Sequence, residues 1–395
     1  MIVLHVFAFV AGVTLVVAAV FSAIRTFVVP RGVPDRLTRI VFIVMRYVFN
    51  PPLPRRRRSF AARERVMTFY APLSLLTLPV VWLACLLTGY TVLFWGLGVG
   101  SWRDAFTASR ESMLSLGYAS ESAPATEAFA FSETVLSLLL GAILISYLPT
   151  MYAAFSQREA AVTGLETRAG SPPSPIKMLI RYHLITGLDQ IGEVWATWLS
   201  WFEIVQESHT SLQPLVFYRS PLPDRSWVTA AGAVLDAAAI VASTLDRKRD
   251  PQAELCIRAG YLCLQRVADV FKIPYNPDPQ PGDPISVTRA DYDALYDQLA
   301  SKGLPLKPDR DQCWRDFAGW RVNYDAVLVA LAVLTMAPDA PWSSDRVPRQ
   351  LSTGTRPDLR AREVAASIIR GEIPVRDSVD RSSQRRRGDG IGAAG

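Results

Sequence analysis

The sequence predicts an all-α protein whose first part consists of transmembrane helices and whose second part is a water-soluble helical domain. Long apolar runs dominate the chain before about residue 156, and charged residues return to their ordinary frequency after it. Charged residues make up 20% of the 395 residues and hydrophobic residues 50%, whereas about 25% charge is usual for a soluble domain. From about residue 176 to 337 the apolar residues recur at helical spacing, which predicts a packed α-helical core.

Three apolar runs are long enough to cross a membrane, and they cover residues 2–29, 66–98 and 128–155. Each exceeds the roughly 20 residues that span a ~30 Å hydrocarbon core. A cleaved signal peptide is the alternative for the first run, but no Lys or Arg precedes it and it is longer than the apolar region of a signal peptide. The runs predict a multi-pass protein of the plasma membrane, the inner membrane of a bacterium.

The segment between the first two runs indicates the orientation of the chain. Its acidic residues are Asp35 and Glu64, and its arginines are far more numerous: Arg31, Arg36, Arg39, Arg46, Arg55, Arg56, Arg57, Arg58, Arg63 and Arg65. Short arginine-rich loops remain in the cytoplasm, so we expect the N-terminus outside and the C-terminus in the cytoplasm. The arginines are expected to face the lipid bilayer and its anionic head groups, and no nucleic-acid partner is expected.

Residues 35–50 lie within this segment and predict an amphipathic helix. Arg39 and Arg46 are two turns apart, so they share one helical face. An interfacial helix on the bilayer surface is one interpretation. A packed extension of the first span is the other.

The connection between the second and third runs bears most on function. Ser101 is a candidate N-cap, and Asp104 three residues later makes a near capping box, so about thirteen residues are expected to form a short helix. That helix is followed by Ser115-Leu116-Gly117-Tyr118-Ala119.

This order of span, short helix, Gly-Tyr segment and span resembles the two-helix pore module of the potassium-channel superfamily, over about residues 70–155. The filter of that family reads Thr-Val-Gly-Tyr-Gly, and Gly117 and Tyr118 match its Gly-Tyr pair. Ala119 replaces the second glycine, which costs roughly 1 kcal/mol if this position needs a positive φ. Leu114 and Ser115 replace the threonines. A selective channel, a non-selective cation pore, a module that does not conduct and an ordinary outer loop therefore stay open.

The resemblance implies passive conduction. Carbonyl groups of residues 115–118 would point inward and replace the hydration shell of a monovalent cation, which is potassium in that family. Gly117 would permit the backbone turn, and Tyr118 would pack outward against the short helix. One chain supplies one filter strand, so a homotetramer is implied. No cofactor and no catalytic residue are expected.

Four further residues are candidates for the pore helix and the gate. Arg110 and Glu111 place charge in the short helix, where they could pair with each other or with neighbouring subunits. Glu133 is either a functional acid inside the membrane or an interface residue paired with Arg110 or Arg103. Gly141 resembles the hinge glycine of an inner helix, and a packing glycine is the alternative.

The second half of the chain predicts a helical cytoplasmic domain. The third span continues as a charged helix over 156–168, and the Gly- and Pro-rich stretch 169–175 ends it. The expected helices are 176–187, 189–208, 226–246, 251–273, 288–302 and 310–337. The last residues, 338–395, predict a mostly disordered basic tail with one helix over 357–370.

Two features of this domain have alternative interpretations. An aromatic stripe predicts core packing, with a ligand-binding box as the alternative; its members are Trp195, Trp198, Trp201 and Phe202. The apolar run 227–245 is interrupted by Asp236, so we interpret it as a buried helix rather than a fourth span.

Few side chains suggest catalysis. The three histidines are far apart and none has the spacing of a zinc site, so no metal site and no enzyme activity are expected; they are His5, His183 and His209. His209 follows a helical pattern and is interpreted as a capping or core hydrogen-bonding residue rather than a catalyst.

The predicted organisation has four parts: a first transmembrane helix with a basic loop (1–65), the pore module (66–168), the helical cytoplasmic domain (176–337) and the tail (338–395). The predicted function is a potassium-channel-like cation channel that its cytoplasmic domain gates, with an unidentified cytoplasmic ligand as a further partner. The alternative is a membrane-anchored signalling or scaffold protein whose helical domain carries the function.

Overall fold

The computed structural model describes residues 2–27, 36–49, 69–114, 123–346 and 357–372. These residues form helices joined by turns, with no β-strand among them apart from an isolated bridge between Leu245 and Leu306. The predicted all-α class is confirmed for this part of the chain. The chain divides into two compact units: unit 1 comprises Met1–Phe155 and Ser211–Tyr218, and unit 2 comprises Ser156–Thr210 and Arg219–Gly395.

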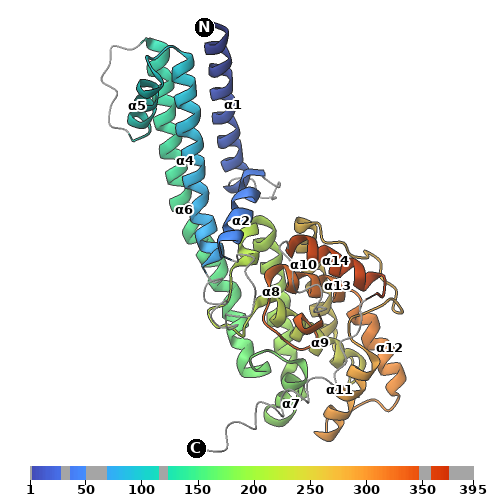
Figure 1. Ribbon diagram of the computed structural model, residues 1–395. Helices are drawn as coiled ribbons and strands as arrows, with labels where there is room; N and C mark the ends of the chain where they lie inside the picture. The colour runs from blue at the N-terminus through green and yellow to red at the C-terminus, as the bar shows by residue number, and fades with distance from the viewer. Residues whose placement is uncertain (1, 28–35, 50–68, 115–122, 347–356, 373–395) are drawn as a thin grey trace, which may run out of the picture. The chain divides into compact units, whose positions relative to one another are not determined.

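Three helices are long and apolar enough to cross a bilayer (Figure 1). They are α1 (Ile2–Phe27), α4 (Tyr70–Gly96) and α6 (Pro124–Ala169). They coincide with the three predicted apolar runs. The α6 helix continues unbroken to Ala169, as the charged pattern over 156–168 predicts, so the division between the two units falls inside this helix.

Helices α1 and α4 are antiparallel, and their backbones nearly touch. A Cβ atom on Gly12 of α1 would lie 2.6 Å from the carbonyl oxygen of Gly89 in α4. A Cβ atom on Gly96 would lie 2.6 Å from the α1 backbone. Further along, Trp82 Nε1 donates to Ser22 Oγ at 3.0 Å in a buried hydrogen bond. Glycines thus allow close packing of the kind found between membrane helices.

Helix α6 runs parallel to α1. The rings of Phe9 and Phe129 lie 5.7 Å apart, and those of Phe27 and Tyr147 lie 4.3 Å apart. The start of α1, the end of α4 and the start of α6 therefore share one end of unit 1, together with residues 97–101, which begin the connection from α4 to α6 (Figure 1). The predicted topology likewise places the N-terminus and this connection on one side.

Helix α2 (Arg36–Phe49) is the predicted amphipathic helix, and it packs against the opposite end of α4. Val41 is buried there, and Tyr70 Oη donates to the carbonyl oxygen of Phe42 at 3.2 Å. The residues one turn apart on another face remain exposed, and they are Ile40, Val44, Tyr47 and Val48. The helix therefore has one apolar face in the core of unit 1 and a second apolar face outside it.

Residues 211–218 belong to unit 1, although two helices of unit 2 precede them. The short helix η3 (Gln213–Phe217) buries Leu215 completely in the core of unit 1. The ring of Phe217 lies 6.3 Å from that of Tyr70, and the ring of Tyr218 lies 5.7 Å from that of Phe155. The sequence placed this segment inside the cytoplasmic domain, because its apolar residues are too few to predict where they pack.

Unit 2 is built around α9 (Trp227–Ser243), in which every residue except Ala242 is buried. Helices α7, α10, α12 and α13 pack against it, so α9 is a core helix, as its apolar pattern predicts. The other elements are α7 (Pro175–Ile185), η2 (Leu188–Ile191), α8 (Gly192–Ser211), α10 (Pro251–Phe271), α11 (Arg289–Ser301), α12 (Arg310–Arg321), α13 (Asp325–Thr335), η4 (Ser344–Arg346) and α14 (Pro357–Ile369).

A buried ion network joins α9, α12 and α13. Arg321 has no exposed surface; its Nε donates to Asp325 Oδ1 at 2.7 Å, and its Nη1 pairs with Asp236. Tyr324 Oη also donates to Asp236, at 2.8 Å. Burial alone would lower the pKa of Arg321, but the two carboxylates raise that pKa and hold the guanidinium charged. The charge that interrupts the apolar run of α9 therefore has an opposite charge beside it.

The single helix predicted over 310–337 is wrong. The chain forms α12 and α13, which bend by 54° at a short break. Within the break, Asn323 Nδ2 donates to the carbonyl oxygens of Gly319 and Trp320 at 3.0 Å each. An asparagine side chain that bonds to local carbonyls competes with the helical pattern, and this explains the interruption without glycine or proline.

The core of unit 2 contains the predicted aromatic stripe, since Trp195, Trp198, Trp201 and Phe202 are all buried. The core-packing interpretation of that stripe is confirmed. The unit also extends beyond the predicted end at residue 337. Trp342 is buried, and α14 packs against α13 through Ala361, Val364, Ala365 and Ile368. Residues 347–356 and 373–395 of the predicted tail lie outside the described residues.

Candidate functional site

Helix α5 (Trp102–Met113) is the short helix predicted between the second and third spans. Ser101 Oγ accepts from the backbone nitrogen of Asp104 at 3.4 Å, and the backbone nitrogen of Ser101 donates to Asp104 Oδ2 at 2.8 Å. This reciprocal arrangement confirms the predicted capping box. Gly98 and Gly100 precede it with φ values of 87° and 52°, so the chain reverses direction immediately after α4.

Helix α5 runs back along α4 instead of lying across its end (Figure 1). Trp102 lies at the end of α4, where its ring is 6.1 Å from that of Trp95. Further along α5, Ser109 Oγ lies 3.1 Å from the carbonyl oxygen of Leu87. A helix rises 1.5 Å per residue, so Leu87 is about 14 Å from the last residue of α4. The short helix therefore turns back along α4 as far as Leu87.

The carboxyl end of α5 is held against α6. Thr134 Oγ1 donates to the carbonyl oxygen of Ser112 at 2.7 Å. Thr134 lies about 15 Å along α6 from its first residue. The last carbonyl groups of a helix carry the negative end of its dipole. A partial negative charge therefore lies beside Thr134 of α6.

Glu133 lies beside α5 and has no exposed surface. Ser109 Oγ is 2.6 Å from Glu133 Oε1 as well as 3.1 Å from the Leu87 carbonyl, and its one hydroxyl hydrogen can serve only one acceptor at a time. Glu133 Oε2 is buried with no hydrogen-bond partner in the described part of the chain. Of the two alternatives for Glu133, pairing with Arg110 or Arg103 is not seen among the described residues, where the carboxyl group points to Ser109.

The remaining predicted residues of the module divide into two groups. Arg110 and Glu111 pair with each other at 3.6 Å, as one of the predicted alternatives has it, and their side chains are partly exposed. The proposed filter residues lie outside the described residues: Ser115, Leu116, Gly117, Tyr118 and Ala119.

Gly141 lies on an open side of α6. A Cβ atom built on it would meet nothing within 4 Å among the described residues, in contrast to Gly12 and Gly89. The exposed apolar side chains of α6 recur at spacings of three and four and form a stripe along the helix; they include Phe131, Val135, Leu138, Ile145 and Tyr152. Within one chain, therefore, no described helix packs against Gly141 as the packing-glycine interpretation would require.

Sequence reasoning missed the residues that fix the position of α5 along α4 and α6. Ala105, Ala108, Ser109 and Ser112 form its buried face, and small residues at this helical spacing let α5 approach two other helices closely. That spacing of small residues is visible in the sequence and is the signal that could have identified the face. Nothing in the sequence pairs Ser109 with Glu133.

A second buried polar cluster lies in unit 2, where α6 meets α8. Arg158 has no exposed surface, and it donates to Glu159 Oε1 at 2.7 Å and lies 3.3 Å from His209 Nε2. Burial, together with the neighbouring Arg158, holds the pKa of His209 well below its ordinary value, so the imidazole is neutral. The interpretation of His209 as a hydrogen-bonding core residue is confirmed.

Searches of protein-family models, of curated proteins and of solved structures find no match to this chain.

Proposed function

We propose that the protein is a potassium-channel-like cation channel in which four copies surround one pore. The observation that carries this proposal is the re-entrant course of α5, whose Ser109 lies level with Leu87 and whose carboxyl end lies beside Thr134. A helix in an ordinary outer loop has no need to enter between two long apolar helices. The geometry therefore favours a pore module over a loop that lies at the membrane surface.

Two physical arguments support a filter in residues 115–119. The negative end of the α5 dipole lies where these residues begin, and it favours a cation there. The chain between Leu114 and Ala123 can reach at most about 30 Å when extended, about twice the ~15 Å that it must return to the start of α6. An extended stretch that presents carbonyl groups to an ion fits this length.

Helix α6 would be the inner helix of the pore. Its exposed apolar stripe, with Gly141 beside it, is not covered by the other described residues of the same chain. In a homotetramer the stripes of four chains would face the pore and one another. Gly141 would then be a hinge at which the helix can bend, because no contact within the chain restrains it.

The membrane arrangement follows from charge. In the plasma membrane, α1 would begin outside the cell and α6 would end in the cytoplasm. The arginine-rich segment 30–66 favours this orientation, because short arginine-rich loops remain in the cytoplasm. The second apolar face of α2, which includes Ile40 and Val44, would lie in the interfacial region of the lipid.

Gating would act through α6, which is continuous from the pore module into unit 2. Arg158 anchors the start of the cytoplasmic part of this helix, because Trp201 Nε1 donates to its carbonyl oxygen at 3.0 Å and its side chain is buried against Glu159 and His209. A movement of α8 would therefore be transmitted to residues 156–168.

Ion flux into liposomes that contain the purified full-length protein tests the proposal. Potassium and sodium are compared for the wild type, for Gly117→Ala and for Tyr118→Val, with Gly192→Ala as a matched control because its Cβ would meet nothing within 4 Å among the described residues. We expect cation flux that the two filter variants abolish or make unselective and that the control leaves unchanged. A folded protein that is monomeric or dimeric and carries no flux would contradict the proposal.

The second candidate is a membrane-anchored signalling or scaffold protein whose unit 2 carries the function. The observation that favours it is that unit 2 has its own core around α9 and its own cavity. In that case Gly117→Ala would be silent in every assay, and the activity of unit 2 would persist without flux.

A further inference from the structure

Glu133 differs from the other buried acids of the described chain in having no arginine beside it. The other buried acids each form an ion pair: Glu159 with Arg158, Asp236 and Asp325 with Arg321, and Asp345 with Arg346. Glu133 forms no ion pair with any described residue, and the contact that its carboxyl group makes is to the hydroxyl of Ser109.

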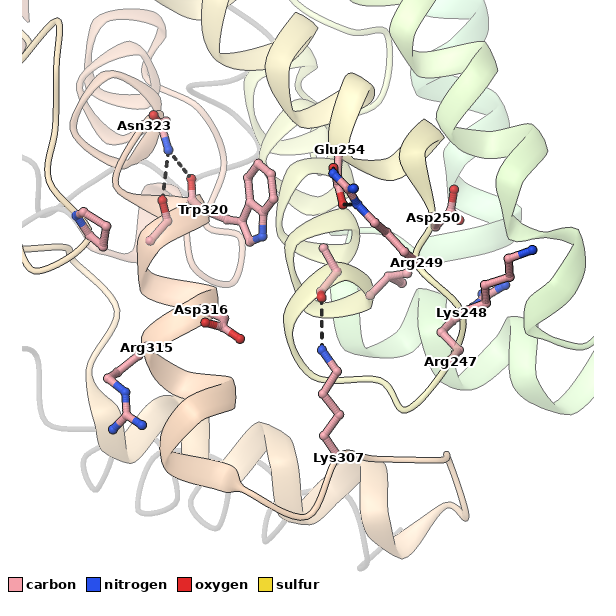
Figure 2. Close-up of a pocket in the computed structure, with 14 residues that line it drawn as sticks. Arg247, Lys248, Arg249, Asp250, Glu254, Lys307, Arg315, Asp316, Trp320 and Asn323 are labelled. Atoms are coloured by element: carbon pink, nitrogen blue, oxygen red, sulfur yellow. Dashed lines mark hydrogen bonds and ion pairs between the residues drawn. The ribbon is translucent and has the colours of Figure 1, made fainter.

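Two acids beside the cavity of unit 2 also have partners, although they are less buried. This cavity of about 540 Å³ lies between α12 and the segment that links α9 to α10 (Figure 2). Glu254 accepts two hydrogen bonds from Arg249, at 2.8 and 2.7 Å. Asp250 accepts from the first backbone nitrogens of α10. Glu133, which has no exposed surface, has neither a cation nor backbone donors in the described chain.

Ionisable side chains of the helices α1, α4 and α5 contact groups other than the Glu133 carboxyl. These pairs are Tyr90 Oη with Ser132 Oγ at 2.7 Å, Arg110 with Glu111 at 3.6 Å, and His5 Nδ1 with the Trp95 carbonyl oxygen at 3.0 Å. At most one hydrogen-bond donor therefore reaches Glu133 from the described residues. An ionised carboxylate in an apolar interior needs an opposite charge or several donors, because its desolvation is costly. The geometry favours a carboxyl group that carries a proton.

A proton on Glu133 also accounts for both close contacts of Ser109. Ser109 Oγ lies 2.6 Å from Glu133 Oε1 and 3.1 Å from the Leu87 carbonyl oxygen, and it has a single hydrogen. If Glu133 is ionised, one of these two contacts has no hydrogen. If Glu133 is protonated, its Oε1–H donates to Ser109 Oγ, and the Ser109 hydroxyl donates to the Leu87 carbonyl oxygen. The added proton thus completes a chain of hydrogen bonds from α6 through α5 to α4.

The end of α5 opposes a negative charge at this position. Thr134, the next residue after Glu133, donates to the carbonyl oxygen of Ser112 at 2.7 Å, in the last turn of α5. The last carbonyl groups of a helix carry the negative end of its dipole. A carboxylate at Glu133 would lie near a partial charge of the same sign, so loss of the proton would weaken the contact between α6 and α5.

We propose that Glu133 is a proton-binding site and that its proton holds α5 between α4 and α6. When the proton leaves to water, Glu133 becomes a carboxylate, the chain of hydrogen bonds loses one member, and the carboxyl end of α5 is repelled. Ser109 is a positioning residue, because it connects Glu133 to α4. The proton site does not depend on conduction, and only its effect on ion flux rests on the proposed channel.

Infrared spectroscopy of the full-length protein in lipid bilayers tests the proposal, because a protonated carboxyl group has a C=O stretching band that a carboxylate lacks. We expect the wild type at neutral pH to show a band that Glu133→Gln lacks and Glu127→Gln keeps. Ser109→Ala should move this band to higher frequency, because the carboxyl group loses its hydrogen-bond partner. Ser112→Ala is the matched control on the same buried face of α5. Its hydroxyl donates within its own helix, to the Ala108 carbonyl oxygen at 2.9 Å, so the band should not move.

Identical bands in the wild type and Glu133→Gln would overturn the proposal, because Glu133 would then be ionised. An unmoved band in Ser109→Ala would overturn the hydrogen-bond chain, and this variant remains informative even if Glu133→Gln fails to fold.

Cation flux into liposomes tests the effect of the proton on conduction. We expect the flux of the wild type to fall as pH rises through the range in which the infrared band disappears, and Glu133→Gln to lose this dependence. Flux that does not change over that range would overturn the role of the proton in holding α5. A wild type that shows the band and carries no flux at any pH would contradict the proposed channel and leave the proton site intact.

Discussion

Unit 1 and unit 2 both bury acidic side chains, but the groups that contact these acids differ between the two units. In unit 2, Asp236 and Asp325 lie against the guanidinium of Arg321. In unit 1, Glu133 is equally buried, yet the partner that the structure shows is the hydroxyl of Ser109, and one carboxylate oxygen has none in the described part of the chain. Removing one partner of a buried ion pair leaves the other charge uncompensated and is strongly destabilising. An acid without a cation inside an apolar helix contributes little to packing and is a functional candidate.

The strongest test of this contrast removes the cation from unit 2. Arg321→Met leaves two buried carboxylates without their partner, and we expect a loss of about 3–5 kcal/mol in the free energy of unfolding. Chemical denaturation of the full-length protein, followed by tryptophan fluorescence, measures it. Arg370→Met removes an exposed arginine paired with Glu372 and is the control, with an expected loss near zero. Equal losses for both variants would remove the distinction.

A second test compares two glycines inside unit 1. Gly12→Ala forces a Cβ atom against the carbonyl oxygen of Gly89, and we expect a destabilisation of about 1–3 kcal/mol from overpacking. Gly141→Ala meets nothing within the described chain and should leave the stability of a single chain unchanged or slightly raised. Thermal unfolding of the two variants in detergent gives both values. A larger loss for Gly141→Ala would show that Gly141 is packed against another chain.

A third test uses pH on the buried histidine of unit 2. His209 binds a proton more weakly in the folded chain than its ordinary pKa of 6.5 implies, because it is buried and lies beside Arg158. Its unfolded form takes up the proton below pH 6.5, so folding stability is full above that pH and falls as pH drops. We expect about 1 kcal/mol to be lost between pH 7 and 5.5. His209→Gln should remove this part of the pH dependence in melting curves, and an unchanged slope would contradict the assignment.

The smallest effect on stability is expected from the acid of unit 1. Glu133→Gln keeps the shape of the side chain and removes a carboxyl group whose described partner is the Ser109 hydroxyl, so we expect a change of about 1 kcal/mol or less. The same variant should alter cation flux in liposomes, whereas Glu127→Gln, near the start of α6, should not. A large loss of stability with unchanged flux would make Glu133 a structural residue like Asp236.

The sequence predicted the helices of unit 1 well, because each one has a strong local signal. The apolar runs give α1, α4 and α6, and Ser101 with Asp104 gives the start of α5. The depth of α5 was not predictable to the same degree. It depends on hydrogen bonds between Ser109 and Leu87 and between Thr134 and Ser112, which join residues about twenty positions apart.

Unit 2 shows the same limit. The aromatic stripe at Trp195 and the apolar run of α9 identified the core, whereas the partner of Asp236 lies far along the chain at Arg321. The cavity beside α12 had no sequence signature, because Lys248, Lys307 and Trp320, which line it, come from three separate segments. Local periodicity predicts elements; it does not predict which distant side chains meet.

The placement of residues 211–218 has a consequence for biogenesis. Leu215 is buried in the core of unit 1, and Phe217 lies against Tyr70. The ribosome makes this segment only after α7 and α8, so unit 1 of a nascent chain lacks a piece of its own interior until then. A chain that stops at residue 168 would lack Leu215 and would expose the apolar side chains of unit 1 that pack around it.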